Sequence, residues 1–90
     1  HSNAILLATA LLEINEIKKN IKKVYTNIIF FYLHNTDISD KKFVSELLNN
    51  NIKIDSKGNR KFRMVTHCGF EKKDVAIVIK TIKKILINYV

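Results

Sequence analysis

Residues 52–67 have the sequence Ile-Lys-Ile-Asp-Ser-Lys-Gly-Asn-Arg-Lys-Phe-Arg-Met-Val-Thr-His, and this stretch decides the fold. Residues 52–54 and residues 61–67 alternate between apolar and polar side chains, which is the period of a β-strand. Between them, residues 56–59 are the turn-forming sequence Ser-Lys-Gly-Asn. We therefore predict a β-hairpin.

The second arm of this hairpin is predicted to have two different faces. Successive side chains of a strand point to opposite sides, so Phe62 and Met64 lie on one face and Arg63 lies on the other. We expect the core on the Phe62 side. A guanidinium on the other face is a planar fork suited to binding a carboxylate through two parallel hydrogen bonds, and a surface ion pair is the alternative. Arg60 and Lys61 are predicted to be solvated charges of the turn and strand edge.

Helical and strand patterns flank the hairpin. Apolar residues at every third or fourth position predict a helix over residues 5–24 and a final helix that begins after Glu71 and runs close to the C-terminus. The β-branched and aromatic residues 26–33 predict a strand buried on both faces. A further helix is predicted to start at Asp40, with Ser39 as its N-cap.

These elements follow one another as helix, strand, helix, strand, strand, helix. This order predicts an α+β fold with a small, mainly antiparallel three-stranded sheet and helices on one face. Four phenylalanines are predicted to be core residues: Phe30, Phe31, Phe43 and Phe62. Residues 1–4, His-Ser-Asn-Ala, are similar to the remnant of a cleaved expression tag, so we expect the natural sequence near Ile5, followed by the N-terminal helix over 5–24 and one small domain over 25–90.

Composition excludes several function classes. The net charge of +8 is distributed as lysine pairs between apolar helix positions, so neither nucleic acid nor membrane is an expected partner. No apolar stretch has the length of a spanning helix. A single cysteine, Cys68, is typical of a reducing compartment, and we expect a cytoplasmic protein.

The sequence contains no glycine-rich phosphate loop, no nucleophile elbow and no histidine pair at metal-binding spacing. We therefore assign no metal site. His67 and Cys68 are adjacent, and adjacent strand residues point to opposite faces, so they are not predicted to form a nucleophile and base pair.

Two segments together resemble the C-terminal part of threonine aldolases, which are pyridoxal-phosphate-dependent enzymes. They are Thr-Asn-Ile-Ile-Phe-Phe at 26–31, and Arg-Met-Val-Thr-His at 63–67 followed by the helix start Phe-Glu-Lys-Lys-Asp-Val at 70–75. In that family a Thr-Asn strand leads into a helix, a hairpin, an Arg-x-Val-Thr-His strand and a final helix. The resemblance covers roughly residues 24–86. It implies that residues 25–90 are the small C-terminal domain of an enzyme with the aspartate-aminotransferase-like fold.

The resemblance implies a role for Arg63, which is to bind the α-carboxylate of the amino-acid substrate. Holding the carboxylate sets which bond at Cα is aligned for cleavage. The parent enzyme would be a lyase that cleaves threonine or allo-threonine to glycine and acetaldehyde. In such enzymes the Schiff-base lysine and the phosphate-binding residues belong to the large domain. This chain is therefore expected to contain no catalytic and no cofactor-binding residue, to bind no cofactor and to be inactive alone.

The expected partners follow from the same resemblance: the large pyridoxal-phosphate domain, a second subunit and the amino-acid substrate. Surfaces that these partners would cover are bare in the isolated domain, so we expect it to self-associate. Two alternatives stay open. One is a stand-alone basic module that binds nucleic acid or an acidic partner. The other is the small domain of a related pyridoxal-phosphate-dependent aminotransferase, because one fold supports several reactions.

Overall fold

A computed structural model describes residues 2–17, 24–25, 28–66 and 71–89. The elements are α1 (Ser2–Leu11), β1 (Val24–Tyr25), β2 (Ile28–Tyr32), α2 (Asp40–Leu48), β3 (Ile54–Gly58), β4 (Lys61–Val65), α3 (Lys72–Leu86) and a 3₁₀ turn, η1 (Ile87–Tyr89). The fold is α+β, as predicted. α1 begins at Ser2 and thus includes part of residues 1–4. That these four residues are the remnant of an expression tag stays a prediction.

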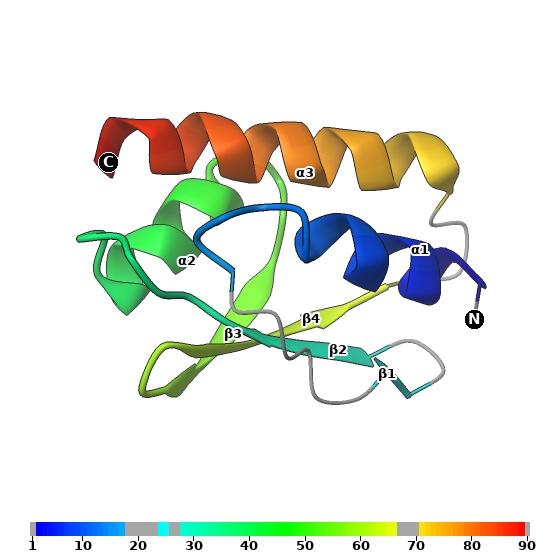
Figure 1. Cartoon of the computed structure of the whole chain (residues 1–90), viewed down its shortest axis with the longest axis horizontal. Helices are drawn as coiled ribbons and strands as arrows, with labels where there is room; N and C mark the ends of the chain where they lie inside the picture. The colour runs from blue at the N-terminus through cyan, green and yellow to red at the C-terminus, as the bar shows by residue number, and fades with distance from the viewer. Residues whose placement is uncertain (1, 18–23, 26–27, 67–70, 90) are drawn as a thin grey trace.

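The sheet is antiparallel throughout, with the strand order β1-β2-β4-β3. β2, β4 and β3 form the predicted three-stranded sheet, and the two-residue β1 adds a short fourth strand at its edge. All three helices lie on the same side of the sheet, with α1 and α2 between it and α3 (Figure 1). This arrangement confirms that the helices cover one face.

Three aromatic rings form the centre of the core. Phe31 on β2 stacks on Phe62 of β4 with 5.7 Å between ring centroids, and Phe43 of α2 meets Phe62 edge-on at 5.1 Å. All three side chains have no exposed surface. They join the two central strands to the helix layer, and aromatic pairs of this geometry add to the stabilisation that burial alone provides.

The strand predicted to be buried on both faces is buried on only one. Ile29 and Phe31 are buried, whereas Ile28, Phe30 and Tyr32 are half-buried on the opposite side. The prediction was wrong because a continuous apolar run does not reveal which face a helix covers. Phe30 is consequently not a core residue, in contrast to the other three phenylalanines.

α2 begins at the residue that the sequence predicts. The Ser39 side chain accepts a hydrogen bond of 3.0 Å from the backbone N–H of Lys42, and the buried Ile38 and Phe43 flank this N-cap. At the other end Asn51 has a φ of 63°, a left-handed conformation that asparagine tolerates. The backbone N–H of Ile52 then donates to the carbonyl of Leu47 at 2.9 Å, which closes the helix.

The hairpin exists, but its first strand and its turn lie later in the chain than predicted. β3 occupies 54–58 in place of 52–54, because the backbone N–H of Ile52 is used to close α2. The turn consists of Asn59 and Arg60, with φ of 54° and 69°, in place of residues 56–59. Positive φ at both central residues is typical of the type I′ turn that matches the twist of a hairpin.

Arg60 is not the solvated charge that we predicted, because it forms hydrogen bonds that connect the turn to the loop before α2 and to the first residue of that helix. Its backbone N–H donates to Asp40 Oδ2 at 3.0 Å, and its Nη1 donates to Asp40 Oδ1 at 2.9 Å. The guanidinium also donates to the carbonyls of Ile38 and Thr36, at 2.6 and 2.9 Å. These contacts offset the cost of a left-handed backbone at a residue with a long side chain.

α1 ends at Leu11, so the predicted helix over 5–24 is wrong at residues 12–17 and at Val24, which belongs to β1. Residues 12–17 form tight turns, for example through the hydrogen bond from the Ile14 N–H to the Leu11 carbonyl at 3.0 Å. The segment after β2 accounts for this end: the backbone N–H of His34 donates to the Glu16 carbonyl at 2.8 Å, and Ile17 pairs with Leu33. Tertiary pairing outweighs helical periodicity here. Residues 18–23 of the predicted helix lie outside the described part of the chain.

The final helix, α3, begins behind Glu71 as predicted. The backbone N–H of Glu71 donates to the carboxylate of Asp74 at 2.8 Å, which satisfies one of the free donors at the helix start. Five apolar residues form its buried side: Val75, Val78, Ile82, Ile85 and Leu86.

The two faces of β2 allow a matched test of the core. We expect Phe31→Ala to lower the free energy of unfolding by about 3–5 kcal/mol, because it leaves a cavity between Phe43 and Phe62. Phe30→Ala removes the same atoms from a half-buried position on the other face and should cost clearly less. Urea denaturation followed by circular dichroism measures both. Equal losses would contradict the assignment of the core to one face.

Candidate functional site

Among the described elements, no helix lies over the second face of the sheet (Figure 1). This face holds a group of half-buried side chains that we call the open-face cluster: Phe30 and Tyr32 of β2, Asp55 of β3, and Lys61 and Arg63 of β4. The strand register places Asp55, Arg63 and Phe30 in one row across three strands, and Tyr32 beside Lys61. The cluster is thus fixed by backbone pairing and not by a loop.

Arg63 lies on this face because its neighbours Phe62 and Met64 are buried on the other, which confirms the predicted orientation. Its guanidinium forms an ion pair with Asp55, directly across the hairpin. Both Nε and Nη2 of Arg63 donate to the same oxygen, Oδ2, at 3.2 and 2.5 Å. The two side chains are 37% and 41% exposed, so water and small solutes reach this pair.

The ion pair with Asp55 uses only some of the N–H donors of the Arg63 guanidinium. Among the described residues, the hydrogen bonds of the Arg63 side chain all go to Asp55 and come from Nε and Nη2. The other edge, formed by Nη1 and Nη2, also matches the two oxygens of a carboxylate. Arg63 therefore has one edge held by the protein and a second that can receive a ligand.

Lys61 adds a second positive charge beside two aromatic rings. Its Nζ lies 4.9 Å from the centroid of the Phe30 ring and 5.9 Å from that of Tyr32. An ammonium above an aromatic face is attracted by the electrons of the ring. Lys61 is therefore held over the sheet, whereas the sequence predicted a solvated charge at its edge. With two cations and one anion, the cluster has one surplus positive charge.

The ion pair with Arg63 lowers the pKa of Asp55. The hydrogen bond from Arg63 lowers the pKa of the Asp55 carboxyl, and the positive charges of Arg63, Lys53 and Lys57 act in the same direction; partial desolvation opposes them. The ion pair therefore persists well into the acidic range.

Several residues singled out in the sequence cannot be placed. His67 and Cys68, and with them the end of the Arg-x-Val-Thr-His segment, lie outside the described residues. Thr26 and Asn27 of the first segment lie outside them as well. Asp55 and the two aromatic residues of the cluster were not predicted as site residues, because their place beside Arg63 depends on the strand register.

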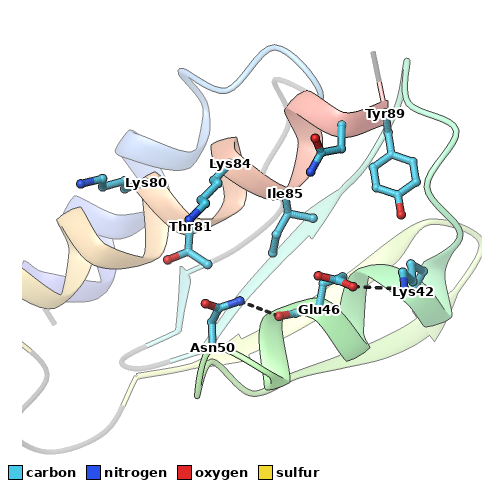
Figure 2. Close-up of a pocket in the computed structure, with 9 residues that line it drawn as sticks. Lys42, Glu46, Asn50, Lys80, Thr81, Lys84, Ile85 and Tyr89 are labelled. Atoms are coloured by element: carbon cyan, nitrogen blue, oxygen red, sulfur yellow. Dashed lines mark hydrogen bonds and ion pairs between the residues drawn. The ribbon is translucent and has the colours of Figure 1, made fainter.

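A second candidate is a groove of about 410 Å³ between α2, the C-terminal half of α3 and η1 (Figure 2). Lys42 forms an ion pair of 3.1 Å with Glu46, and Asn50 Nδ2 donates to the Glu46 carbonyl at 2.9 Å. The hydrogen bond from Lys42 to Glu46, and then the attraction between their charges, raises the pKa of the lysine. The polar groups on the α2 side are thus satisfied by one another. Lys80 and Lys84 give the groove a positive surplus, but its lining has no arginine fork for a carboxylate. This groove is the weaker candidate.

No family model and no curated protein matches this chain. Within residues 2–17, 24–25, 28–66 and 71–89, no three His, Cys, Asp or Glu side chains gather closely enough to hold a metal ion. No helix in these ranges combines the length and apolar character required to cross a bilayer.

The open-face cluster can bind and orient a small anion. Its cations, Lys61 and Arg63, occupy alternate positions on one face of β4, and aromatic rings lie beside Lys61 to contact the apolar part of a ligand. Recognition of an anion is the chemistry that these charges and rings favour.

The lowered pKa of Asp55 gives a pH-dependent test. Because the folded-state pKa lies below the unfolded one, the stabilisation from the ion pair is present at neutral pH and is lost as pH falls through the folded-state value. We expect the Asp55 carboxyl to titrate at a higher pH in Arg63→Gln than in the unmodified chain, as followed by carbon-13 NMR. Unchanged titration would mean that Arg63 does not hold this carboxylate.

Proposed function

We propose that this chain is the substrate-recognition part of a pyridoxal-phosphate-dependent threonine aldolase, namely its small C-terminal domain. The observation that carries this proposal is the position of Arg63, in the middle of a rigid strand on the side of the sheet that the helices leave open. The order of elements agrees with that of the family, although small α+β domains of this kind serve many functions.

In this proposal Arg63 binds the α-carboxylate of the amino acid through Nη1 and Nη2. The Asp55 carboxylate holds the other edge of the guanidinium, which restricts rotation about the long side chain before a ligand arrives. Prior fixation lowers the entropy lost on binding. Lys61 and Phe30 line the approach, and their charge and ring surface favour an anion with a short apolar side chain.

The parent enzyme would supply what this chain lacks. Pyridoxal phosphate, when bound in the large domain, withdraws electrons from the amino-acid Cα so that the bond to the side chain can break. The residues described here would determine only where the substrate lies and which bond is aligned. Alone, the chain is expected to release no acetaldehyde from threonine.

Carboxylate recognition can be measured on the isolated chain. We expect acetate to shift the Arg63 Nε–H resonance and the backbone amides of Asp55 and Met64 in a saturable manner, whereas neutral acetamide should not. Arg63→Gln removes the guanidinium and should abolish the response of these backbone amides to acetate. The side chain of Arg60, which donates to Asp40 and to two backbone carbonyls, is the internal reference. Equal responses to acetate and acetamide would contradict the proposal that Arg63 binds a carboxylate.

The reaction class requires the parent enzyme. In a full-length aldolase that contains this chain, Arg63→Lys should lower kcat/KM for threonine by about 100-fold, since lysine cannot form two parallel bonds to a carboxylate. Lys61→Gln removes a neighbouring charge without that fork and should have a much smaller effect. Acetaldehyde release measures both variants. Normal kinetics with Arg63→Lys would show that another group binds the carboxylate.

A further inference from the structure

The helix layer contains an apolar groove whose edge carries only positive charge. It lies between α1 and α3, which pack side by side, and has a volume of about 530 Å³ (Figure 1). The apolar lining consists of Leu6, Ala10, Val75, Ala76 and Ile79. Val75 is buried and Ile79 is half-buried, whereas Ala76 and Leu6, which is 37% exposed, reach the surface, so the groove is shallow and open to solvent.

Three lysines of α3 complete the lining: Lys72, Lys80 and Lys83. No carboxylate lines the groove, and in the described part of the chain none of the three has an ion-pair partner. With a rise of about 1.5 Å per residue, they extend over about 16 Å of the helix. That length corresponds to about three turns of a helix lying alongside.

We propose that this α1–α3 groove binds an acidic amphipathic helix of a partner protein. Apolar side chains spaced every three or four positions on the partner would enter the groove, as in other helix-in-groove complexes. Glutamates or aspartates on the side facing α3 would pair with the three lysines. The inference is independent of the aldolase proposal, because it concerns the opposite side of the molecule from the open-face cluster.

Charge selects this partner over a second copy of the chain. Each copy has a net charge of +8, and a symmetric contact through this groove would bring the lysines of both copies together.

A designed peptide tests the groove directly. The probe is a helix with leucines every three or four positions on one side and glutamates at the flanking positions. We expect it to shift the backbone amides of residues 6–10 of α1 and 72–83 of α3 in nitrogen-15 NMR spectra, with affinity that falls as salt is added. A peptide with lysine in place of glutamate should bind at least about tenfold more weakly.

Neighbouring lysines provide a matched pair of variants. Lys83 lines this groove, whereas Lys84 lines the groove of Figure 2, and both are exposed. Lys83→Glu should weaken the peptide by about tenfold, while Lys84→Glu, with the same change in net charge, should stay within about twofold. Ala76→Glu, at an exposed position of the groove, should weaken it as Lys83→Glu does. The spectra themselves report that each variant is folded.

Four results would overturn the proposal: equal effects of Lys83→Glu and Lys84→Glu, shifts centred outside α1 and α3, equal binding of the lysine peptide, or no binding of the glutamate peptide. Vesicles of anionic phospholipid that shift the same amides, when the peptide does not, would assign this face to a membrane. A dimer in analytical ultracentrifugation that protects these amides without peptide would assign it to a second copy.

Discussion

The packing of Phe31 and Phe62 against Phe43 is the contact on which the other features depend. It ties the two central strands to α2 and thereby decides which side of the sheet becomes the core. Because strand side chains alternate, this choice also places every second residue of β2 and β4 on the opposite side. Arg63, Lys61 and Phe30 are neighbours as a direct result. The position of the cluster is therefore a consequence of how the core is built.

Local sequence signals were sufficient for some elements. α2 starts at the predicted residue because Ser39 and the pair Ile38 and Phe43 act within a few positions of each other. α3 starts directly after Glu71 for a similar reason, because the Asp74 carboxylate three residues later accepts a hydrogen bond from the Glu71 backbone N–H. The side of β4 on which Arg63 lies follows from the burial of Phe62 and Met64. The alternation of apolar and polar residues in the sequence was sufficient to predict it.

Features that depend on residues far apart in the chain were predicted poorly. The turn lies at Asn59 and Arg60 because Asp40, twenty residues earlier, holds Arg60 in a left-handed conformation. The end of α1 follows from pairing of Ile17 with Leu33. The partner of Arg63 could not be predicted either, since a register shift in β3 decides that Asp55 lies opposite it. The α1–α3 groove likewise requires knowing which two helices are neighbours.

The contact of Arg60 with Asp40 has a further consequence for the dynamics of the domain. It connects the tip of the hairpin to the first turn of α2, two segments that would otherwise open independently. Opening of the turn removes the guanidinium from the carbonyls of Thr36 and Ile38, so the loop before α2 is released in the same event. We therefore expect the hairpin tip and the start of α2 to unfold locally as one cooperative unit, so that their amides exchange with solvent hydrogen together.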